Sequence, residues 1–86
     1  MFFRHHDISD EGAHLHAQFK KLGELPGRSF NEITVHVCMD PVEVKYLEDG
    51  TRVYKWARVG YEIEMLFDHS DRCIKVMHEC AKLFPE

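Results

Sequence analysis

The dipeptide Asp49-Gly50 lies between two segments in which apolar and polar residues alternate. Asp-Gly is a preferred pair for a tight hairpin turn, because such turns need positive φ angles at their central residues. The period-two pattern predicts two antiparallel strands, 30–48 and 51–67, each with one buried face. A long β-hairpin is therefore the central element that we expect in the fold.

The first of these strands changes phase near its middle. Its apolar positions are odd-numbered up to Met39 and even-numbered from Val42 onward, whereas the return strand keeps odd parity. A two-residue turn combined with a β-bulge at Asp40-Pro41 opposite Arg58 accounts for this difference, since a bulge tolerates the missing N–H of proline. The expected hairpin is therefore bent.

A three-residue turn at the same place is the alternative register. It pairs Val44 with Tyr54 and Val42 with Trp56, which also gathers apolar side chains, but it requires both strands to switch faces at one level. We favour the bulge, which leaves Tyr54 and Trp56 on the exposed face of the hairpin. The two registers differ most in where they place these two aromatic residues.

One helix is predicted on each side of the hairpin. Ser9 offers a cap for a helix over about 10–22, which Gly23 ends. Asp68 and its neighbours offer caps for a second helix over about 70–84, whose apolar stripe is Cys73, Met77, Cys80 and Phe84. We predict a single two-layer α+β domain spanning 1–86 in the order (β)-α-β-β-α, in which residues 1–6 add an optional edge strand.

Size, cysteine content and charge restrict the class of protein further. The 86 residues contain three cysteines without a CxxC pair, Cys38, Cys73 and Cys80, so we expect free thiols in a reducing compartment. Neither a signal peptide nor an apolar stretch of membrane-spanning length is recognised, so we expect a cytoplasmic protein. A formal net charge of −4 argues against a general polyanion binder.

A cluster of aromatic and basic residues is the strongest candidate binding surface. In the favoured register the exposed face near the turn carries Lys45, Arg52, Tyr54, Trp56 and Arg58. Exposed aromatic residues beside arginines are typical of protein interfaces and also suit stacking on single-stranded nucleic acid. Glu62 and Glu64 follow on the same face and interrupt a basic track, so we favour a protein partner.

Two groups of chemically reactive side chains are weaker candidates. Four histidines and one aspartate, His5, His6, Asp7, His14 and His16, lie close together in the sequence, but His14 and His16 fall on different sides of a helix. We therefore expect surface histidines, without a bound metal or other cofactor. His36 and Cys38 share a strand face in which Glu62 is expected to pair with His36, and no third catalytic group accompanies them.

The sequence thus favours a small non-enzymatic regulator or inhibitor that binds another protein through its hairpin. The broad apolar face of the predicted second helix also suggests a homodimer. A phage or mobile-element origin is an expectation from small size and acidic charge. A single-stranded nucleic-acid-binding protein and a histidine-based metal-binding protein are the alternatives.

Overall fold

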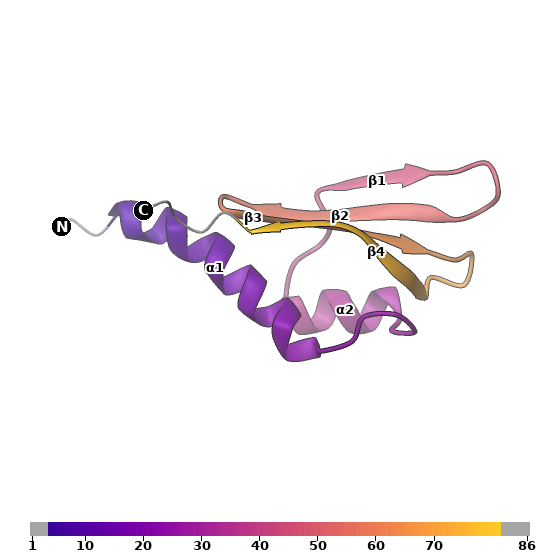
Figure 1. Cartoon of the computed structure of the whole chain (residues 1–86), viewed down its shortest axis with the longest axis horizontal. Helices are drawn as coiled ribbons and strands as arrows, with labels where there is room; N and C mark the ends of the chain where they lie inside the picture. The colour runs from indigo at the N-terminus through magenta and orange to yellow at the C-terminus, as the bar shows by residue number, and fades with distance from the viewer. Residues whose placement is uncertain (1–3, 82–86) are drawn as a thin grey trace.

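The computed structural model describes residues 4–81, which form two helices followed by four strands (Figure 1). The elements are α1 (Arg4–Leu22), α2 (Phe30–Val37), β1 (Glu43–Tyr46), β2 (Arg52–Arg58), β3 (Tyr61–Phe67) and β4 (Cys73–Ala81). The strands form one antiparallel sheet in the order β1-β2-β3-β4. Both helices lie on one side of this sheet (Figure 1), so the predicted α+β class is confirmed.

Residues 30–37, predicted as the start of a strand, form helix α2. Ser29 caps this helix, because its hydroxyl oxygen accepts a hydrogen bond from the Glu32 N–H at 3.0 Å. Ile33 and Val37 are buried one helical turn apart, whereas Val35 is exposed. The predicted strand was wrong here because a local cap and a helical spacing of buried residues outweigh the β propensity of isoleucine and valine.

The turn at Asp49-Gly50 is confirmed, but the favoured register is wrong. The structure pairs Val44 with Tyr54, as the three-residue turn requires, and the Leu47 N–H donates to the Thr51 C=O at 2.9 Å. The bulge at Asp40-Pro41 opposite Arg58 does not form, because the chain before Val42 belongs to α2 and its exit rather than to a paired strand.

The predicted return strand 51–67 is divided into two strands. A turn at Val59-Gly60 lies between β2 and β3, and Gly60 adopts a φ of 96°. Arg58 and Tyr61 then face each other across the hairpin. Because the chain reverses at this turn, the buried residues are even-numbered on β2 and odd-numbered on β3.

The helix predicted over 70–84 is strand β4 in its described part, and residues 82–84 lie outside the described residues. The preceding aspartate does not cap a helix. The Asp68 carboxylate accepts the backbone N–H groups of Ser70 and Arg72, and Asp71 adopts a φ of 63°. These contacts turn the chain back along β3, which excludes a helix at this point.

Two β-bulges interrupt the pairing of β4 with β3. Ile74 and Met77 have no partner in the register with β3. Each bulge adds one residue, so Cys73, Val76 and Glu79 occupy positions opposite core residues of β3 at intervals of three. Cys73 is buried, Val76 is half-buried and Glu79 is exposed, so the apolar stripe that predicted a helix does not coincide with the face of β4 that packs on the core.

Helix α1 extends farther toward the N-terminus than predicted. It ends at Leu22, as expected, but begins at Arg4, so Ser9 lies within the helix and is not its cap. Arg4, His5 and His6 therefore do not form the optional edge strand, and residues 1–3 of that prediction lie outside the described residues. At Gly12 the helix backbone lies directly against the β2–β3 turn.

The core lies between the helices and the sheet. Trp56 is 0% exposed and packs among aromatic rings from α1, α2 and β3, which are those of Phe19, Phe30 and Phe67. Its indole N–H donates to the Met39 C=O at 2.8 Å, which connects the exit of α2 to the sheet. The opposite face of the sheet is not covered by any element of the described chain (Figure 1).

Candidate functional site

The structure separates the five residues predicted to form one binding surface. Tyr54 and Trp56 are buried on the face of the sheet that the helices cover, so their predicted exposure is wrong. This follows from the three-residue turn, which reverses the face that even-numbered residues of β2 occupy. Without these aromatic rings, the expected stacking surface for a protein or nucleic-acid partner is not present at this place.

The three basic residues of that set lie in different surroundings. Arg52 lies on the helix-covered face, where it pairs with Asp71 at 2.6 Å. Arg58 lies at the far end of β2 and approaches Glu11 of α1 at 3.7 Å. Lys45 is exposed on the uncovered face of the sheet, opposite Val53. They therefore do not form one basic surface.

A different set of apolar residues is exposed on and beside strand β1. We name it the β1 patch, and it consists of Val42, Val44, Tyr46 and Leu47. Tyr46 is 69% exposed and Val44 41%, although both lie on the same face of the sheet as the core. The Arg52 guanidinium lies 5.6 Å from the centre of the Tyr46 ring, which holds the ring beside a positive charge.

The sequence analysis assigned Val44 and Tyr46 to the buried face, and their exposure was not predicted. They are exposed because β1 is the edge strand farthest from α1, and helix α2 covers β2 and β3 rather than β1 (Figure 1). No signal in the sequence reports how far a helix layer extends over a sheet. The β1 patch could therefore not have been found from periodicity.

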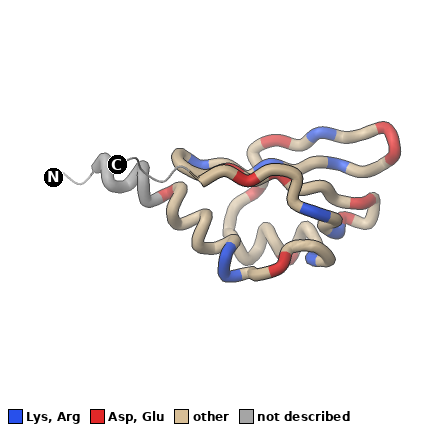
Figure 2. Tube along the Cα trace, viewed as in Figure 1, with Lys and Arg blue, Asp and Glu red and all other residues tan. Residues whose placement is uncertain are grey.

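A row of charged side chains crosses the uncovered face of the sheet. Lys55 of β2 lies 3.9 Å from Glu43 of β1 and 3.5 Å from Glu62 of β3, and Glu62 in turn accepts a hydrogen bond from His78 of β4 at 3.1 Å. The hydrogen bond from His78 and the charge of Lys55 hold the pKa of the Glu62 carboxyl below its ordinary value. Figure 2 shows that acidic and basic residues alternate along β1 and the turn that follows it, whereas the charged residues of β2 are all basic.

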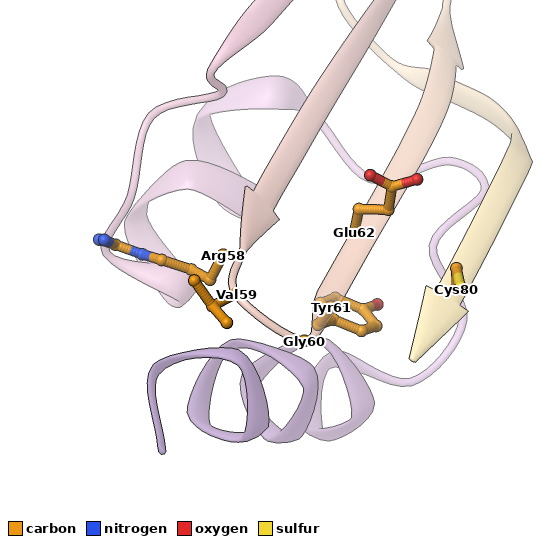
Figure 3. Close-up of a pocket in the computed structure, with 6 residues that line it drawn as sticks. All are labelled: Arg58, Val59, Gly60, Tyr61, Glu62 and Cys80. Carbon is orange, nitrogen blue, oxygen red and sulfur yellow. The ribbon is translucent and has the colours of Figure 1, made fainter. Parts of the chain in front are cut away.

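A hollow of about 430 Å³ lies at the β2–β3 turn, beside the end of β4 (Figure 3). Its lining residues are Arg58, Val59, Gly60, Tyr61, Glu62 and Cys80. Figure 3 shows that the side chains of Arg58 and Glu62 point in different directions. Arg58 is engaged by Glu11, Glu62 by Lys55 and His78, and the Tyr61 hydroxyl donates to the Glu79 carboxylate at 2.7 Å. These polar groups do not converge on a common point, so the hollow lacks a catalytic arrangement.

Two of the four histidines that were considered as metal ligands, His14 and His16, have separate contacts. His16 stacks on the Tyr61 ring at 4.6 Å, and His14 lies 3.4 Å from the Gln18 amide nitrogen. Among residues 11–81, whose side chains the structure describes, no group of three or more histidine, cysteine, aspartate or glutamate side chains is arranged to hold a metal ion. The side chains of His5, His6 and Asp7 lie outside this range. The expected contact between His36 and Glu62 is wrong, because His36 belongs to α2 and Glu62 contacts His78.

The three cysteines are unpaired, and they differ in exposure: Cys38 is exposed, Cys80 is half-buried and Cys73 is buried. Burial raises the pKa of the Cys73 thiol to about 11. The unfolded chain ionises this thiol at lower pH than the folded chain does, so the contribution of Cys73 to stability is fully present below about pH 9 and is lost as pH rises toward 11.

We expect the free energy of unfolding to fall by about 2 kcal/mol between pH 8.5 and 11 on account of this one thiol. Urea denaturation under reducing conditions measures this slope. Cys73→Val should reduce the slope, because valine cannot ionise, whereas Cys38→Ser serves as the matched control and should leave it unchanged. An unchanged slope in Cys73→Val would contradict the assignment.

These observations define a small α+β protein with an aromatic core, an ion-paired open sheet face and an exposed apolar edge strand. No family model, curated protein or solved structure matches the chain. Among the described residues, neither helix combines the length and the apolar character needed to cross a membrane.

Proposed function

We propose that this protein is a non-enzymatic regulator or inhibitor that binds another protein through the β1 patch. The observation that carries this proposal is the exposure of Tyr46 and Val44 on an edge strand, at the end of the sheet that the helices leave uncovered. Exposed tyrosines beside arginines are enriched among the residues that dominate binding energy at interfaces. The unpaired cysteines support a reducing compartment such as the cytoplasm.

The environment of Tyr46 favours recognition of a protein surface over a small molecule. The patch is a strip along one strand, and its apolar residues alternate with Glu43 and Lys45 on the opposite face. On the face of the patch itself, Arg52 lies beside Tyr46, and an extended apolar strip next to a charged residue resembles the core and rim of a protein interface. A small-molecule site would instead require a concave pocket with converging polar groups.

Capture of partner proteins by the immobilised protein tests this proposal. The comparison uses the wild type, Tyr46→Ser and Val59→Ser, with lysate from the source cells and quantitative mass spectrometry. Val59 is the matched control, since it is 60% exposed but lies at the opposite end of β2. We expect Tyr46→Ser to lose at least about tenfold in partner capture and Val59→Ser to retain it. Equal capture by Tyr46→Ser and the wild type would sink the proposal.

A further inference from the structure

The backbone of β1 has hydrogen-bonding groups that no other strand of the described chain uses. The Leu47 N–H donates to Thr51, and Tyr46 and Val44 face Arg52 and Tyr54 at the neighbouring positions of the ladder. Hydrogen-bonded and non-hydrogen-bonded pairs alternate in an antiparallel ladder. Val44 and Tyr46 therefore direct their N–H and C=O groups away from β2, toward the free edge of the sheet.

The two edges of the sheet differ in how readily they accept another strand. Within residues 4–81 the opposite edge is β4, and the bulges at Ile74 and Met77 interrupt its regular spacing. Bulges are one of the features that prevent edge strands from pairing with other chains. From Glu43 to Tyr46 the register of β1 with β2 has no such shift, and the Val42 N–H just before β1 donates to the Lys55 C=O at 2.7 Å. The four residues of β1 are therefore the part of this edge that is suited to pairing.

We propose that the free edge of β1 pairs with the same edge of a second copy of this chain. The two strands run antiparallel about a two-fold axis at Val44, and the two sheets become one continuous sheet. This inference goes beyond the proposed function, because the dimer forms whether or not the β1 patch also binds another protein.

The alternation of hydrogen bonds limits the possible registers. Residues whose backbone groups point outward must face one another, which allows self-pairing centred on any of the four residues of β1. Centring on Tyr46 places Val44 opposite Glu48, which lies in the turn beyond β1. Centring on Glu43 places that carboxylate opposite its own copy, and centring on Lys45 does the same with two ammonium groups. Centring on Val44 places Lys45 opposite Glu43 of the second copy, and does so twice by symmetry.

The charged row on the uncovered face supports the same register. In one copy the signs alternate from Glu62 through Lys55 to Glu43, which lies 3.9 Å from Lys55. Lys45 lies on this same face, as its pairing with Val53 shows. When the register is centred on Val44, Lys45 of the second copy follows Glu43 in the row, so the alternation of charge continues across the two-fold axis.

The apolar face gains from the same arrangement. Val44 lies opposite Val44 of the second copy, so a side chain that is exposed in one copy contacts its equivalent between copies. The Val42 N–H donates to the Lys55 C=O within one copy at 2.7 Å, so the hydrogen bonds between copies are those of Val44 and Tyr46. Val44 and Tyr46 of the two copies then form one strip on the helix side of the joined sheet. Because β1 has only four residues, we expect a weak dimer whose population depends on protein concentration.

Charge reversal tests the register by sedimentation equilibrium. Lys45→Glu and Glu43→Lys each place like charges opposite each other twice, and each should weaken dimerisation by roughly tenfold. The double variant Glu43→Lys/Lys45→Glu exchanges the two charges and should restore dimerisation. A protein that stays monomeric at all concentrations, or a double variant that is weaker than both single variants, would overturn the proposal.

Disulfide trapping gives an independent test of the same register. The parent variant is Cys38→Gly, which removes the exposed thiol and suits the φ of 57° at that position. Adding Val44→Cys should give a cross-linked dimer on mild oxidation, because the two-fold axis brings these Cα atoms within disulfide range. Lys45→Cys in the same parent should cross-link much more slowly, since its copies lie diagonally apart. Faster cross-linking of Lys45→Cys would overturn the proposed register.

These results are separable from those of the partner-capture experiment. A monomeric protein that loses its partner on Tyr46→Ser would contradict the self-pairing and support the proposed function. If Val44→Cys traps a dimer and Tyr46→Ser leaves the captured partners unchanged, the self-pairing is supported and the proposed function is contradicted.

Discussion

Replacing Trp56 with alanine is expected to lower the free energy of unfolding by about 3–5 kcal/mol. The side chain is 0% exposed and packs against rings from three elements, and its indole N–H satisfies the Met39 C=O. Alanine leaves a large cavity and an unpaired carbonyl, and a small domain has only about 5–15 kcal/mol of total stability. Urea denaturation followed by far-ultraviolet circular dichroism measures the loss.

Two control variants separate the contributions at this position. Trp56→Phe keeps most of the apolar contact but lacks the indole donor, so we expect a smaller loss of about 1–3 kcal/mol. Val59→Ala removes an exposed side chain and should change stability by less than about 0.5 kcal/mol. A Trp56→Ala variant as stable as Val59→Ala would show that the ring is not in the core. In the wild type, acrylamide should quench the fluorescence of this single tryptophan only weakly.

Replacing Gly12 with alanine is expected to destabilise the protein by about 1–3 kcal/mol. A Cβ atom at this position would lie 1.9 Å from the backbone oxygen of Val59, so helix α1 would have to move away from the β2–β3 turn. The sign of the change in the free energy of unfolding makes the test decisive. In a helix without this contact, alanine would be stabilising by about 1 kcal/mol relative to glycine. Thermal or urea denaturation measures the difference.

Ala13 provides the matched control for this prediction. It follows Gly12 in the same helix and is exposed. Ala13→Gly should cost about 1 kcal/mol through helix propensity alone. If Gly12→Ala instead raises the stability, then α1 does not pack closely on the β2–β3 turn.

The sequence analysis identified the class of fold and one turn, but it assigned two segments to the wrong secondary structure. Ser29 precedes the segment 30–37, and Glu32 follows three residues later, which is the spacing of a helix-capping signature. This signal was present in the sequence. The alternation of Ile33, Val35 and Val37 suggested a strand instead. Only the packed structure shows that Val35 is exposed, which leaves a helical spacing of buried residues.

The error at β4 has a different physical origin. Cys73, Met77 and Cys80 recur at a helical spacing, and periodicity alone cannot distinguish this pattern from that of a helix, although Met77 is exposed in the strand. What decides between the two is the pairing with β3, which satisfies the backbone hydrogen bonds of the segment. That pairing depends on residues distant from β4 in the sequence.

The candidate site was predictable only in part. Lys45 was identified from the sequence and lies on β1, where it also takes part in the proposed self-pairing. The sequence pattern is compatible with two turns at Asp49-Gly50. The favoured turn places Tyr54 and Trp56 at the surface, and the other places them on the buried face. Burial of Trp56 among Phe19, Phe30 and Phe67 decides that choice, and it requires contacts between three elements.

Local patterns in the sequence by themselves determined the α+β class, the turn at Asp49-Gly50 and the end of helix α1 at Leu22. Each of these features depends on residues that lie close to one another in the sequence. Only the tertiary structure decided which face of β2 is buried and that β1 remains an exposed edge. The physical reason is that burial depends on what packs against a strand, and the extent of the helix layer over the sheet is a property of the whole chain.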